Sequence, residues 1–163
     1  MRQLLTIDFS LTLVPTSVNE ARQMLAKTEI LFSPGADRMI DRMSFQLTRY
    51  GKQILFIVAS VRELGFPKGG ILSQVAKSAQ ENFGLYPVPA SFVPVLRTAY
   101  RNQPLCEYLS LAMDPIIVHG RRWVFTIGHG GKGLWILADT GDPDKVWCGS
   151  WKWVFLSPLL PIT

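Results

Sequence analysis

Cysteine and histidine are scarce in this sequence. The chain of 163 residues contains two cysteines, Cys106 and Cys148, and two histidines, His119 and His129. Their spacing matches neither a CxxC motif nor another zinc-site pattern. A metal would need two or three convergent ligands, so an aspartate from residues 139–144 would have to join the histidines. We therefore predict no metal site, and free thiols rather than a disulfide framework.

Sequence motifs of large enzyme classes are also missing. The chain has no Gly-x-Ser-x-Gly elbow, no HExxH helix and no Walker phosphate loop. The glycine-rich residues 128–133 resemble a phosphate loop only superficially. A phosphate loop opens a helix whose N-terminus faces the anion, whereas the residues that follow here have the pattern of a strand. We predict no cofactor, and we rank an enzyme below a binding role.

Long hydrophobic runs are absent as well. The longest apolar run, Ile54 to Ser60, is far shorter than the roughly 20 residues that cross a membrane. Asp8 interrupts the N-terminal apolar stretch, which has no small-residue cleavage site. We predict a cytoplasmic protein without a membrane partner. Charged residues make up only 18% of the chain and the mean hydropathy is +0.19, which indicates a covered surface, as in a homo-oligomer or a partner complex.

The C-terminal third predicts an antiparallel β-meander over about 105–156. Trp123, Phe125 and Ile127 alternate with smaller residues, so they share one face of a strand. Turn residues at 130–133 and 139–144 separate this strand from the next two, which are predicted at 134–138 and 146–155. All five tryptophans fall in this block. They form either the core or an exposed aromatic platform for a partner.

The first two-thirds of the chain predict about four helices, within residues 17–103, that pack on the meander. Capping and periodicity place them at about 17–27, 33–50, 71–83 and 91–101. Alternation predicts a half-buried strand at 5–13, and an apolar run predicts a doubly buried strand at 53–61. The fold class is therefore α+β, in a single domain spanning 1–163.

Candidate binding residues follow from a moderate basic excess, with a formal charge of +5 and a pI of about 9.5. Arg97 and Arg101 are four apart on the last predicted helix and should share a face beside Tyr100. Gln103 and Glu107 follow closely. Such a set suits recognition of phosphate, carboxylate or base edges. The alternative is a solvated helix face on which Arg97 pairs with Glu107. A second basic feature, Arg121-Arg122, lies at a predicted hairpin tip.

Residues from Ser60 to Phe155 resemble a family of small bacterial and phage-borne proteins. The family has no established activity, so the resemblance implies a domain and not a reaction. The chain departs from the family at Tyr86, Val93 and Asn102, where the family usually has cysteine, glycine and aspartate. The first of these departures leaves that loop without a thiol. The residues that carry the resemblance are Leu64-Gly65-Phe66, Gly84-Leu85, Leu96-Arg97, Tyr100, Gln103-Pro104, Glu107, Ala112, Pro115, Val146-Trp147 and Val154-Phe155.

Three functions remain open from the sequence. The first is a non-catalytic nucleic-acid-binding module, in which helices 71–83 and 91–101 form a helix-turn-helix-like pair and the Arg121-Arg122 hairpin contacts backbone phosphate. The second is a protein-interaction module of mobile-element origin that uses the tryptophan face. The third is a small enzyme with a pocket near Arg97, Tyr100 and Glu107.

Overall fold

A computed structural model describes residues 1–8, 14–45 and 53–158 of the chain. It shows an α+β protein with four α-helices and one large mixed sheet, as the sequence predicts. The buried side chains form one hydrophobic cluster between the sheet and the helices. Among the described helices, none has the length and apolar character that crossing a bilayer requires. The helices are α1 (Val18–Ala26), α2 (Pro34–Ile40), α3 (Leu72–Phe83), the 3-10 turn η1 (Ala90–Phe92) and α4 (Val93–Ala99).

Eight of the strands in the described residues belong to the large sheet, and two short ones form a separate pair. The order across the large sheet is β1-β3-β10-β5-β7-β8-β2, with β6 paired to β7 at the side. The small pair joins β4 to β9. The strands are β1 (Arg2–Asp8), β2 (Leu31–Phe32), β3 (Gln53–Ser60), β4 (Gly70–Ile71), β5 (Tyr108–Leu111), β6 (Ile116–Val118), β7 (Arg121–Gly130), β8 (Gly133–Thr140), β9 (Val146–Trp147) and β10 (Lys152–Pro158).

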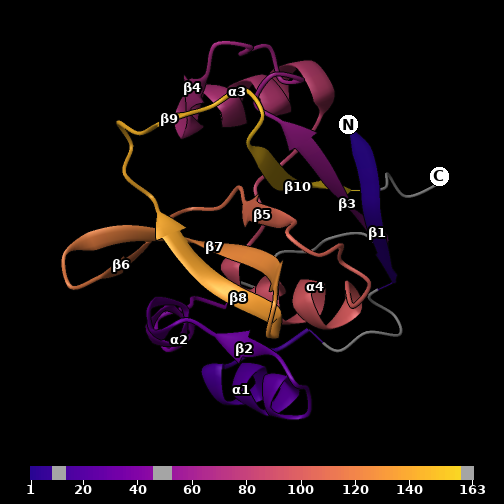
Figure 1. Cartoon of the computed structure of the whole chain (residues 1–163), viewed down its shortest axis with the longest axis vertical. Helices are drawn as coiled ribbons and strands as arrows, with labels where there is room; N and C mark the ends of the chain where they lie inside the picture. Colours follow the sequence, from indigo (N-terminus) through magenta and orange to yellow (C-terminus); the bar gives the residue numbers. More distant parts are fainter. Residues whose placement is uncertain (9–13, 46–52, 159–163) are drawn as a thin grey trace.

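The last strand joins the sheet at a different place from the one that a simple meander predicts. Strands β5, β7 and β8 follow one another as antiparallel neighbours, as expected. β10 does not continue from β8. It lies between β3, to which it is antiparallel, and β5, to which it is parallel. The predicted single strand over 146–155 is divided, because the chain turns at residues 148–151 between β9 and β10. β10 therefore connects the N-terminal strands to the meander (Figure 1).

Four of the five tryptophans lie in or against the core, and none is among the exposed side chains, so they do not form an exposed platform. Trp153 and Trp147 are 0% and 3% exposed, and their ring centroids lie 4.7 Å apart in an edge-on contact. Trp151 is half-buried against Trp147 at 5.2 Å and donates from Nε1 to the hydroxyl of Ser110. The remaining two, at 123 and 135, are half-buried on β7 and β8. Buried aromatic rings of this size contribute much of a core's apolar contact area.

Local signals in the sequence identify most of the helix ends. Ser17 accepts from the Glu20 backbone N–H at the start of α1, while the Glu20 carboxylate reaches back to the backbone N–H of Thr16. Gly84 ends α3 with a positive φ of 63°, where a side chain would be strained. α2 ends at Ile40, so the helix predicted over 33–50 is shorter than expected. Residues 9–13 and 46–50 of the predicted elements lie outside the described residues.

The prediction of a helix-turn-helix pair is wrong. Figure 1 shows α3 at one end of the molecule, beside β4, and α4 near the other end, close to α1. A recognition helix must expose the face that enters a groove. α4 instead buries Val93, Pro94, Val95, Leu96 and Arg97. Its apolar residues pack into the core, so α4 cannot present these side chains to a duplex.

Candidate functional site

Arg97 lies at the centre of the polar contacts around α4, and its side chain is 0% exposed. Nη1 donates to Gln103 Oε1 at 2.6 Å, and to the carbonyls of Gly128 at 3.3 Å and Trp135 at 3.4 Å. Nη2 donates to the carbonyl of Tyr100. These contacts join the end of α4 to the paired strands β7 and β8. The prediction that Arg97 lies on a solvated helix face is therefore wrong.

No described carboxylate contacts Arg97, and its charge is opposed only at longer range by Glu107, which itself pairs with Arg2. The four acceptors of Arg97 are an amide and three backbone carbonyls, all of them uncharged. Nε is buried and has no hydrogen-bond partner among the described residues. Burial lowers the pKa of the guanidinium to about 10, because a cation is disfavoured away from water. A buried cation of this kind favours an anion nearby.

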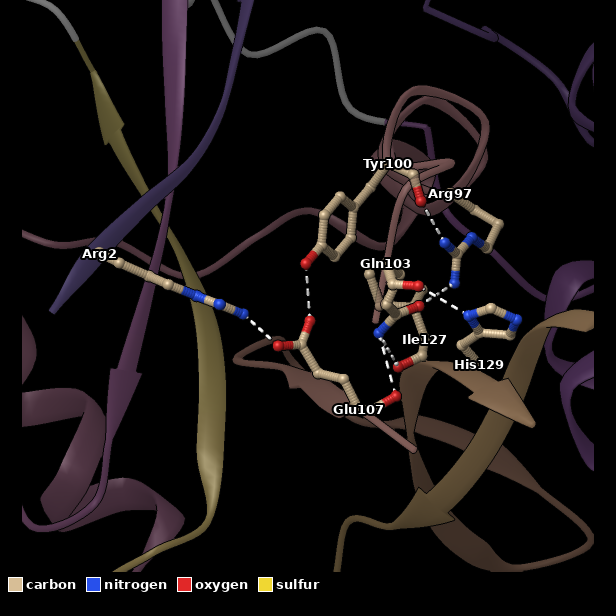
Figure 2. Close-up of polar contacts among 7 residues, drawn as sticks. All are labelled: Arg2, Arg97, Tyr100, Gln103, Glu107, Ile127 and His129. Carbon is tan, nitrogen blue, oxygen red and sulfur yellow. Dashed lines mark hydrogen bonds and ion pairs between the residues drawn. The ribbon is translucent and has the colours of Figure 1, made fainter. Parts of the chain in front are cut away.

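Gln103 holds the loop after α4 against the sheet (Figure 2). It is 2% exposed, accepts from Arg97, and donates from Nε2 to the carbonyls of Glu107 and Ile127, both at 3.2 Å. The backbone carbonyl of Gln103 lies 2.7 Å from Nδ1 of His129. Because a carbonyl can only accept, Nδ1 of His129 carries the hydrogen in this contact. The sequence gives no sign that His129 belongs to this network.

Glu107 pairs with Tyr100 and Arg2 and not with Arg97, as Figure 2 shows. The Tyr100 hydroxyl donates to Oε1 of Glu107 at 2.7 Å, and Arg2 of β1 forms an ion pair with Oε2. Burial and the bond to the carboxylate raise the pKa of Tyr100 to about 12. The predicted Arg97–Glu107 pair is therefore wrong. The contact instead fixes the loop after α4 to the edge strand of the sheet.

Replacing Tyr100 with phenylalanine should lower the free energy of unfolding by about 1.5–3 kcal/mol at pH 7, because a hydrogen bond to a charged acceptor is lost. The pKa of Tyr100 is raised in the folded protein, so its contribution is complete below about pH 10, the unfolded value. It decreases as the pH rises to about 12. Urea titrations of both proteins from neutral to alkaline pH test this. A difference between them that stays constant above pH 10 would contradict it.

The two basic features predicted from the sequence do not share a surface. Arg121 and Arg122 are exposed at the start of β7, next to the turn at His119 and Gly120. Arg97 contacts the same strand at Gly128, six residues beyond Arg122. At about 3.3 Å per residue these two points are roughly 20 Å apart, and the β7–β8 turn lies further still. The two basic features are therefore separate sites for a small ligand.

One pocket of about 800 Å³ lies beside Arg97, and we call it the basic pocket. Its walls come from residues 27–31 after α1, from the end of α4, and from residues 132–134 at the β7–β8 turn. Lys27, Arg97, Arg101 and Lys132 line it, against a single carboxylate from Glu29. Lys27, Arg101 and Lys132 are exposed and form no ion pair with any described residue.

The basic pocket contains two of the residues predicted from the sequence and omits five. Arg97 and Arg101 line it, whereas Tyr100, Gln103 and Glu107 do not. Gln103 and the Tyr100 carbonyl accept from Arg97, and Glu107 contacts Tyr100. The arginines at 121 and 122 lie at the far end of β7. Lys27 and Lys132 were missed, because nothing in the sequence places residues 27 and 132 beside each other. The pocket holds no cysteine or histidine, and no described group of three acidic, cysteine or histidine residues is arranged to bind a metal.

No family model matches the chain, and neither the curated proteins nor the solved structures include one that is significantly similar to it. The resemblance to bacterial and phage-borne proteins stays a prediction. The function is therefore inferred from the geometry of the basic pocket.

Proposed function

We propose that the protein is a non-catalytic module that binds nucleic acid, with phosphate groups of the ligand held in the basic pocket. The observation that carries the proposal is the excess of cations there. Four positively charged side chains line the pocket and only Glu29 opposes them. Guanidinium and ammonium groups bind phosphate oxygens through short, charge-assisted hydrogen bonds. A volume of about 800 Å³ lies within the range of ligand sites.

The buried guanidinium of Arg97 supports an anionic ligand more specifically than surface charge does. Lysines on a solvated face are already stabilised by water. Arg97 is shielded from water, and its described hydrogen-bond partners are all neutral. Electrostatic attraction increases as the effective dielectric falls, so an anion in the pocket interacts with Arg97 more strongly than with the exposed cations at equal distance.

Binding of a short single-stranded oligonucleotide should be strongly salt-dependent, because each phosphate contact releases counterions. A six-nucleotide strand spans about 20 Å when stacked, less than the roughly 30 Å length of β7 that separates Arg121 from the β7–β8 turn, so in its stacked form it does not bridge Lys132 and the Arg121 hairpin. The double substitution Arg101→Gln with Lys132→Gln should reduce the slope of log K against log salt by about 1.4, at about 0.7 for each lost contact. Fluorescence anisotropy over a salt series measures this slope.

The matched control removes the same charge from the other end of β7. Arg121→Gln with Arg122→Gln lowers the net charge equally and should leave the affinity and the slope for the short strand nearly unchanged. If both double variants weaken binding equally, the effect comes from net charge and the assignment to the basic pocket is wrong. If the unmodified protein binds no oligonucleotide at low salt, the proposed function is wrong.

A further inference from the structure

We infer that the basic pocket binds a nucleotide through its phosphate monoester, the group found at the end of a strand or on a free nucleotide, in preference to an internal phosphodiester. This rests on the proposed function and names the part of the ligand that the pocket recognises. Three features of the pocket favour a monoester: its charge, the position of its buried cation, and its apolar walls.

The charge of the pocket matches a monoester better than a diester. Lys27, Arg101 and Lys132 come from three different segments and line one opening, and Arg97 adds a fourth positive charge. A phosphate monoester carries about −1.5 to −2 at neutral pH and has three terminal oxygens, whereas a diester carries a single charge. More oxygens and more charge allow contacts to several of these cations at once.

The buried cation favours a ligand group that enters the pocket. Arg97 lines the pocket, is 0% exposed, and has an unpartnered Nε among the described residues. Lys27, Arg101 and Lys132 are exposed. The phosphate of an internal linkage is connected on both sides and remains with the strand on the surface. A terminal phosphate is connected on one side only, so it can enter between the exposed cations, contact them directly and interact with the buried charge of Arg97 behind them.

The remaining walls suit a sugar and a base. A volume of about 800 Å³ is much larger than a phosphate group needs, and Ile30, Leu31 and Leu134 supply apolar surface. The hydroxyls of Thr28 and Thr98 already donate to the carbonyls of Leu25 and Pro94. Their oxygens are thus available as acceptors, as is the Glu29 carboxylate, and such acceptors suit ribose hydroxyls or base amino groups.

Two strands with equal numbers of phosphates test the inference. A six-nucleotide strand with a 5′-phosphate and a seven-nucleotide strand with a 5′-hydroxyl each contain six phosphate groups. The 5′-phosphorylated strand should bind roughly tenfold more tightly, the effect of one additional good charged contact. A 3′-phosphorylated strand shows whether the other end is recognised, and adenosine monophosphate compared with adenosine tests the free nucleotide. Arg101→Gln with Lys132→Gln should abolish the preference, and Arg121→Gln with Arg122→Gln should retain it.

The outcomes separate this inference from the proposed function. If every strand binds with the same salt-dependent affinity whatever its end, the inference is wrong and nucleic-acid binding stands. If adenosine monophosphate binds at the pocket, adenosine does not, and no strand binds, the monoester inference stands and the nucleic-acid function is wrong. If end-phosphorylated strands bind more tightly than the monophosphate, the ligand is a strand end. If nothing binds, both are wrong.

Discussion

Replacing Arg97 with alanine is expected to lower the free energy of unfolding by about 3–5 kcal/mol, a large part of the stability of an ordinary domain. The substitution leaves Gln103 Oε1 and the carbonyls of Tyr100, Gly128 and Trp135 without this donor, in a site closed to water. It also leaves a cavity where a fully buried side chain was. Equilibrium urea unfolding, followed by tryptophan fluorescence, measures the change.

Arg101→Ala is the matched control for this prediction. Arg101 is the same residue type four positions later, but it is exposed, and its one described hydrogen bond runs from Nε to the carbonyl of Thr98. Exposed substitutions of this kind usually change stability by no more than about 0.5 kcal/mol. Equal effects of the two substitutions would contradict the buried position of Arg97. A near-neutral Arg97→Ala would contradict its structural role.

Trp153→Ala is expected to lower the free energy of unfolding by a similar amount, about 3–5 kcal/mol. Trp153 is 0% exposed on β10, where it lies between β3 and β5 and contacts the ring of Trp147. Removing the indole opens a cavity that strands paired on both sides cannot close. Calorimetry or urea unfolding of the variant measures the loss.

Two further substitutions on β10 separate packing from hydrogen bonding. Trp153 Nε1 is buried without a partner among the described residues, so no hydrogen bond opposes its removal. Trp153→Phe should therefore lower stability much less than Trp153→Ala. Lys152→Ala replaces an exposed neighbour and should be nearly neutral. A phenylalanine variant as unstable as the alanine variant would show that the contribution of Trp153 does not come from apolar packing.

Local patterns predicted the elements well. The apolar run at residues 53–61 predicted a strand, and β3 occupies Gln53–Ser60, although only one of its faces is fully buried, since Leu55 and Ile57 are half-buried. The Ser17 and Gly84 signals marked the ends of two helices. The order of the strands in the sheet could not be predicted from local patterns, because β3 pairs with β10, about a hundred positions away in the chain. No local signal identifies so distant a partner. Without such a signal, the simplest prediction is a meander in which each strand pairs with the next one along the chain.

The candidate site was found only in part, and for a physical reason. The spacing of Arg97 and Arg101 implies a shared face only while the helix continues. α4 ends at Ala99, and Tyr100 leaves helical geometry with φ −89° and ψ 65°. The two side chains therefore separate, one into the interior and one to the surface. Lys27, Arg101 and Lys132 are brought together only by the tertiary fold, so no sequence pattern predicts that they line one pocket.

The position of β10 has a consequence for how the protein is made. A ribosome completes β3 and β5 long before residues 152–158 emerge, yet these two strands meet only through β10. Until then the nascent chain exposes two unpaired strand edges in the middle of its future sheet. Such edges invite association with other chains, and late long-range pairing slows folding. We therefore expect the centre of the sheet to be the last part of this protein to form.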